Sequence, residues 1–129
     1  MQKFIFILCC IFTTSAYSQR SCKFVLPLDS IEVNLWIIDS LGNNNSRNAI
    51  YLRHFFQTPG DREKYNGICQ NCILEVLGSP NRVFKRKKEE KYIYFIKRES
   101  KEIDSFYEGR TLEIIFKNQK VINFSFFIT

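Results

Sequence analysis

The chain has 129 residues, of which 45% are hydrophobic and 25% charged, and its formal net charge is +6. This length suits one domain and excludes large catalytic architectures such as the (β/α)8 barrel. The composition is typical of a globular protein and excludes disordered, collagen-like and coiled-coil classes. Thirteen Phe and six Tyr supply enough aromatic side chains to fill a small core.

The first eighteen residues have the pattern of an export signal. Lys3 precedes an unbroken apolar run over 4–12, and Ala16-Tyr17-Ser18 places small residues where a signal peptidase cuts. The run is shorter than the ~20 residues that cross a bilayer. We therefore predict a signal peptide over 1–18 and a single mature domain over 19–129. The alternative is a buried N-terminal strand.

Removal of 1–18 takes away only Lys3, which leaves a net charge of +5. The predicted location is periplasmic or secreted, and nucleic acid is therefore not an expected partner. A basic exported domain favours acidic proteins or anionic lipid headgroups at a membrane surface. A lipid anchor on Cys22 is the lesser alternative, because Arg20 suits the preceding lipidation signal poorly.

Three cysteines remain in the mature chain: Cys22, Cys69 and Cys72. Cys69 and Cys72 have the C-x-x-C spacing of a thiol–disulfide redox site. Their predicted place inside a helix, with no thioredoxin-like strand before it, favours a structural role instead. That role is either buried thiols or a disulfide that ties Cys22 to the helix. A zinc site needs about four ligands, which the three cysteines and the lone His54 could supply only by coincidence, so no metal is predicted.

The first half of the mature chain is predicted to be mainly helical. Residues 31–41 have apolar side chains at 31, 35, 38 and 41, which indicates a helix capped by Asp29 or Ser30. Alternation at 31, 33 and 35 leaves a strand as the alternative. A second helix is predicted over 48–57, capped by Ser46, and a third over 61–77, ended by Gly78.

The second half is predicted to be a sheet. Four strand-like runs cover 82–87, 91–98, 111–117 and 120–129, with hairpin tips at 117–120 and 88–90. The predicted fold class is α+β, with two or three helices packed on one face of an antiparallel sheet of three or four strands. Alternation along the last two runs predicts that one set faces the core: Leu112, Ile114, Phe116, Ile122, Phe124, Phe126 and Ile128.

A sheet covered by helices on one side leaves its other face to solvent. The second face of this sheet is mixed rather than cleanly polar, and tyrosines contribute strongly to interfaces. We predict a partner-binding patch there, formed by Tyr92, Tyr94, Ile115, Lys117, Asn123 and Phe127. The alternative is that the N-terminal arm, or Phe106 and Tyr107, cover this face.

The junction Leu77-Gly78-Ser79-Pro80-Asn81-Arg82-Val83, the run Tyr92-Ile93-Tyr94-Phe95 and the final hairpin Leu112 to Val121 form an ordered pattern. This pattern resembles the SmpA/OmlA group of small outer-membrane lipoproteins and the fold-related β-lactamase inhibitor proteins. The resemblance covers about 55 residues. It implies two helices on an antiparallel sheet that binds other proteins.

No catalytic motif is present in the sequence. His54 is the lone histidine, and Glu99, Glu102, Asp104 and Glu108 lie together on a predicted solvated loop. We predict an exported protein-binding module that is not an enzyme and holds no cofactor. The alternatives are a thiol–disulfide redox protein that uses Cys69 and Cys72, and a lipid-tethered structural protein of the cell envelope.

Overall fold

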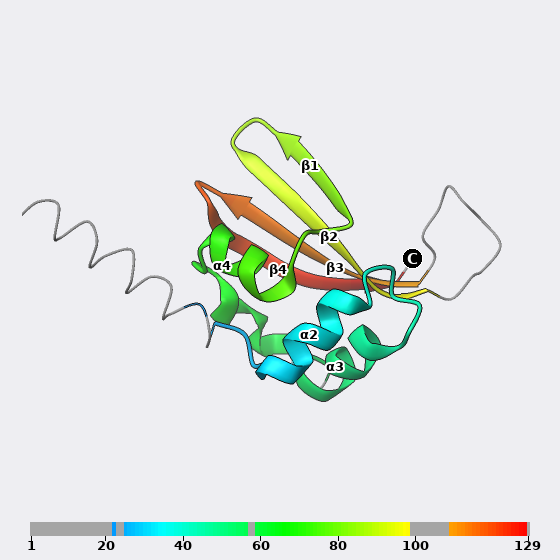
Figure 1. The fold of residues 1–129 in the computed structure, drawn as a ribbon. Helices are drawn as coiled ribbons and strands as arrows, with labels where there is room; N and C mark the ends of the chain where they lie inside the picture. Colours follow the sequence, from blue (N-terminus) through cyan, green and yellow to red (C-terminus); the bar gives the residue numbers. More distant parts are fainter. Residues whose placement is uncertain (1–21, 23–24, 57–58, 99–108, 129) are drawn as a thin grey trace, which may run out of the picture.

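A computed structural model describes residues 22, 25–56, 59–98 and 109–128. Among these residues, three α-helices come first, with a 3-10 helix between the second and the third: α2 (Ser30–Ile38), α3 (Ser46–His54), η2 (Pro59–Tyr65) and α4 (Gln70–Leu77). Four antiparallel strands follow in the order β1-β2-β3-β4. Their bounds are β1 (Arg82–Arg86), β2 (Glu89–Arg98), β3 (Gly109–Lys117) and β4 (Lys120–Ile128). The predicted α+β class is confirmed, with the helices gathered on one side of the sheet (Figure 1).

The segment that the sequence left open between helix and strand is helix α2. Asp29 caps it: its carboxylate accepts from the Glu32 amide at 2.8 Å, and the Glu32 side chain accepts from the Asp29 amide in return. This capping box gives hydrogen-bond acceptors to the Asp29 and Glu32 amides at the start of the helix, and it therefore favours a helix over a strand here.

The face of α2 that packs inward is not its most apolar one. Trp36 and Asp39 are almost completely buried, and Glu32 is also buried. The apolar stripe on the opposite face is exposed: Ile31, Leu35 and Ile38. The inward polar groups are paired, because the Asp39 carboxylate accepts from the amides of Asn44 and Arg47. A buried aromatic ring and satisfied carboxylates therefore decide the orientation of this helix.

The second helix starts two residues earlier than predicted. Ser46 is its first residue, and its N-cap is Asn45, in a left-handed conformation with no side-chain capping bond. Near its end, His54 Nε2 lies 2.8 Å from the Glu32 carboxylate and joins α3 to α2.

The predicted third helix over 61–77 is wrong, because the chain breaks into η2 and α4. Gly67 has a φ of +91°, which ends any regular helix. The Gly67 amide donates to the Val121 carbonyl at 2.7 Å, and the Val121 amide donates to the Ile68 carbonyl at 2.9 Å. The segment therefore leaves the helical path to pair with the start of β4, and Cys69 becomes the N-cap of α4.

The sheet is joined by tight turns at 87–88 and 118–119. The second turn places Asn118 and Gln119 at positive φ, and the predicted hairpin between the last two strands is confirmed. The first tip lies one residue earlier than expected, so that Glu89 and Glu90 belong to β2. The β2–β3 connection, with its predicted carboxylates and the aromatic pair 106–107, lies outside the described residues, as does the predicted signal 1–18.

A β-bulge changes which residues of β4 face the core. The register skips Ile122, since Ile115 pairs with Asn123 and Phe116 pairs with Val121. Val121 is therefore buried, whereas Ile122, predicted to be in the core, is exposed. Ile128, also predicted to be in the core, keeps the side of Phe124 and Phe126 but is exposed at the end of β4. The rest of the predicted core face is confirmed: Leu112, Ile114, Phe116, Phe124 and Phe126.

Arg47 of α3 links the helices to the sheet. Its side chain is 2% exposed and donates to the carbonyls of Trp36 and Phe95, each at 2.8 Å. The same guanidinium donates to the Asn81 side chain at 3.1 Å and lies over the Trp36 ring. One side chain thus satisfies acceptors on α2, on β2 and on the segment before β1.

Candidate functional site

The structure separates the six residues predicted to bind a partner. Tyr92 and Tyr94 lie on the helix-covered face, because they pair with Ile114 and Leu112 of the core. Tyr94 is fully buried, and its hydroxyl donates to the Gly78 carbonyl at 2.9 Å. The prediction that these two tyrosines form part of an exposed patch is therefore wrong.

Burial of Tyr94 also affects its ionisation. Desolvation raises the pKa of its hydroxyl well above the ordinary range, because the phenolate would lose its water. Tyr92 hydroxyl accepts from the Gln70 side chain at 2.7 Å, and its ring packs on Phe116. Both tyrosines consequently serve the core.

The other four predicted residues lie on the opposite side of the sheet: Ile115, Lys117, Asn123 and Phe127. Ile115 and Asn123 are directly opposite each other, and Phe127 pairs with Thr111 two rows away. The register adds apolar side chains from the first two strands that the sequence reasoning did not include: Phe84, Ile93 and Phe95. We call this side the open face, since α2, α3 and α4 all lie on the other side (Figure 1).

The open face combines an apolar centre with basic groups. Its apolar side chains come from all four strands: Phe84, Ile93, Phe95, Ile115 and Phe127. Among the residues whose register places them on this face, five are cations and two are carboxylates: Arg82, Arg86, Lys91, Lys117 and Lys120 against Glu89 and Glu113. This part of the sheet therefore carries an excess of positive charge.

Two of the cations lie against the aromatic rings of this face. The Arg82 guanidinium is 5.5 Å from the centre of the Phe95 ring, and Lys91 Nζ is 5.3 Å from that of Phe84. Lys91 also lies 3.8 Å from the Glu113 carboxylate. These contacts place basic groups directly beside the aromatic side chains of the open face.

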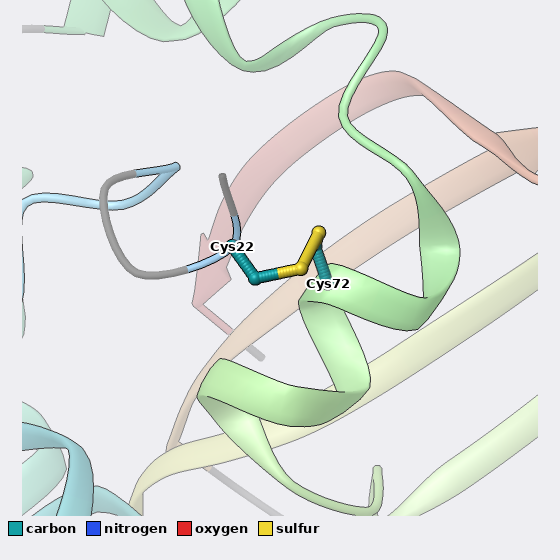
Figure 2. Close-up of a disulfide and its surroundings, with 2 residues drawn as sticks. All are labelled: Cys22 and Cys72. Atoms are coloured by element: carbon teal, nitrogen blue, oxygen red, sulfur yellow. A yellow bond between two sulfur atoms is a disulfide. The ribbon is translucent and has the colours of Figure 1, made fainter. Parts of the chain in front are cut away.

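The cysteines form a structural link. Cys22 is bonded to Cys72 of α4, which is one of the two structural alternatives that the sequence left open (Figure 2). The N-terminal arm (residue 22 and residues 25–28), α2 and α4 together border a groove of about 740 Å³. Its lining includes Leu26, Leu28, Val33 and Val76. Cys69, the other member of the C-x-x-C motif, is an exposed free thiol. The redox alternative needs a Cys69–Cys72 bond, which this pairing does not provide.

Loss of this bridge should lower the stability of the domain substantially. The Cys22→Ser, Cys72→Ser double variant is expected to lose about 4 kcal/mol of unfolding free energy on the chain-entropy model, because the bridge spans 50 residues. Denaturant unfolding of the oxidised protein measures the loss. The control Cys69→Ser should unfold like the parent, and an equal loss in that control would contradict the assigned pairing.

The described residues hold no cluster for metal binding. No group of three or more His, Cys, Asp or Glu side chains among them could hold a metal ion. His54 is paired with Glu32 between two helices, which is a structural contact.

Within the described part of the chain, no helix has both the length and the apolarity to cross a membrane.

Comparison with family models, curated proteins and solved structures finds no match for this chain.

Proposed function

We propose that the protein is a small exported binding module without a catalytic centre, which engages a partner protein through the open face. One observation carries this proposal: the five apolar side chains of the open face come from all four strands and lie on the side that the helices leave uncovered. Phe84 and Phe127 remain about half exposed there. Apolar patches with a polar rim mark interaction sites on soluble proteins.

The charge of this face indicates the chemistry of the partner. An excess of cations around an apolar centre favours a protein surface with its own apolar centre and a rim of Asp and Glu. Exposed charges mainly speed association and are screened by salt. We expect the association rate to fall as ionic strength rises, while the dissociation rate changes little.

Export is part of the same proposal. The signal-like pattern over 1–18 favours a periplasmic or secreted protein, and the Cys22–Cys72 disulfide agrees with an oxidising compartment. The resemblance of the final hairpin to the SmpA/OmlA group supports a protein-binding role at the cell envelope. A lipid-tethered form would keep the same open face, and intact mass of the mature chain separates the two forms.

The decisive variant is Phe127→Asp, with Leu52→Asp of α3 as its matched control. The two side chains are 45% and 46% exposed, but they lie on opposite sides of the sheet. A partner is first captured from the envelope fraction of the native host, then purified and titrated against each folded variant.

We expect Phe127→Asp to weaken the affinity at least tenfold and Leu52→Asp to leave it unchanged, since an aromatic contact at an interface centre dominates binding. Hydrogen exchange of the complex should protect β3 and β4 amides. Equal affinity of both variants, or protection confined to α2 and α3, would overturn the proposal.

A further inference from the structure

The two edges of the sheet differ in how they are covered. The start of β4 is paired with the segment before α4, through bonds of Gly67 and Val121 and through the Gln70 amide, which donates to the Gln119 carbonyl. β1 forms the other edge, and its described ladder partner is β2 alone. All five residues of β1 are exposed. A bare edge presents a row of main-chain donors and acceptors to an incoming strand.

The register indicates which groups of β1 are available. Hydrogen-bonded and non-hydrogen-bonded pairs alternate along an antiparallel ladder, and a two-residue turn closes on a hydrogen-bonded pair, here Arg86 with Glu89. Counting back along the strand, Phe84 and Arg82 direct their amides toward β2. Val83 and Lys85 therefore direct their amides and carbonyls away from the sheet.

The side chains of β1 specify the charge of a strand that could join it. Three of its five residues are cations: Arg82, Lys85 and Arg86. On the inner side, β2 places Glu90 opposite Lys85 and Glu89 opposite Arg86. Opposite charges directly across a ladder stabilise strand pairing, and like charges destabilise it. A strand that pairs with the outer side of β1 should therefore carry acidic residues opposite these cations.

We infer that the β1 edge binds an extended acidic segment of a partner protein as a fifth strand of the sheet. The complementary antiparallel sequence has acids opposite Arg86, Lys85 and Arg82, with apolar residues opposite Phe84 and Val83. Main-chain bonds to Val83 and Lys85 supply the alignment, and the cations supply the selectivity. This site goes beyond the proposed function, because it uses the edge of the sheet rather than the open face.

A second copy of the chain is a poor occupant of this edge. Antiparallel pairing of β1 with itself about Phe84 places Arg82 opposite Arg86. The other edge strand, β4, has the sequence KVINFSFFI and contains no Asp or Glu. Neither edge strand therefore supplies carboxylates for the cations of β1, and the inferred occupant is a segment of a different protein.

The test uses the peptide acetyl-Thr-Glu-Glu-Val-Val-Glu-Thr-amide, titrated into the whole mature protein by NMR and calorimetry at low and at physiological salt. Two controls carry the same side chains and the same charge. Each control is N-methylated at every second amide, and the two sets of methylated amides are offset by one residue. One peptide therefore loses the donors facing β1, and the other loses the donors facing outward. Only pairing to the strand edge distinguishes these two peptides.

We expect binding by the parent peptide and by the control that keeps its donors toward β1. The control that lacks those donors should bind at least tenfold more weakly. On binding, the Val83 and Lys85 amides should become protected from exchange. Val83→Pro should remove binding while Val83→Ala retains it. Lys85→Glu should weaken it far more than the matched reversal Lys64→Glu on η2.

Equal binding of the two methylated controls would overturn the inference, since that result indicates non-specific charge attraction. No binding of any peptide would identify the cations of β1 as simple edge protection and would also overturn it. Phe127→Asp should leave peptide binding unchanged, so that failure at the edge and failure of the open face are distinguishable.

Discussion

Replacement of the buried Arg47 by methionine is expected to lower the unfolding free energy by about 4 kcal/mol. Methionine has a similar length and keeps most of the packing, but it donates no hydrogen bond. The carbonyls of Trp36 and Phe95 and the Asn81 side chain would then lose their shared donor inside the protein. A buried acceptor left without a partner costs more than the net value of the bond. Denaturant unfolding followed by circular dichroism measures the change.

Arg53→Met provides the control on the same helix. The Arg53 side chain is 70% exposed, and its ion pair with Glu32 is long, at 3.8 Å. Exposed pairs of this kind contribute less than about 1 kcal/mol. We expect this variant to unfold within about 0.5 kcal/mol of the parent. Similar losses in the two variants would contradict the assignment of Arg47 as the link between helices and sheet.

Local patterns in the sequence predicted the type of most elements but not their orientation. The 31, 35, 38 and 41 spacing correctly indicated a helix for α2. Nothing in that spacing shows that Trp36 and Asp39 pack inward, because their partners are Tyr94 of β2 and Arg47 of α3. Both partners lie outside the helix, and these contacts override the amphipathic pattern of the helix itself.

Four of the six residues predicted for the patch lie on the open face and two do not, because the sequence constrains the faces of the two strand pairs differently. Alternation along β3 and β4 placed Ile115, Lys117, Asn123 and Phe127 on one side of the sheet. Counting across the two-residue turn at 118–119 would instead pair Ile115 with Ile122, and only the bulge at Ile122 brings Asn123 opposite Ile115. Ten residues, 99–108, separate β2 from β3 in the sequence, and the run 92–96 is apolar at every position. Alternation within that run therefore cannot decide which face Tyr92 occupies.

The break in the predicted third helix has a similar origin. Asn66 and Gly67 provide a local signal for a turn, but Gly is tolerated inside many helices at a cost of ~1 kcal/mol. The pairing of Gly67 and Ile68 with Val121 decides the outcome. This contact depends on where β4 lies, and the helical periodicity of 61–77 contains no information about it.

Because Tyr92 and Tyr94 lie on the helix-covered face, their replacement should lower the stability of the domain strongly. Tyr94→Ala should lose about 3–5 kcal/mol of unfolding free energy, because it removes a fully buried ring that packs on Trp36 and leaves the Gly78 carbonyl without its hydroxyl donor. Tyr92→Ala adds a second cavity beside Phe116. The double variant should therefore be largely unfolded at room temperature, since small domains have only about 5–15 kcal/mol of stability.

The matched control for the tyrosines is Phe127→Ala on the open face, where an aromatic ring is 45% exposed. It should lose less than about 1 kcal/mol, because a half-exposed ring leaves no enclosed cavity when it is removed. Thermal and denaturant unfolding of the three variants decide the question directly. If Tyr94→Ala were as stable as Phe127→Ala, Tyr94 would belong to the open face, and the register that defines that face would be wrong.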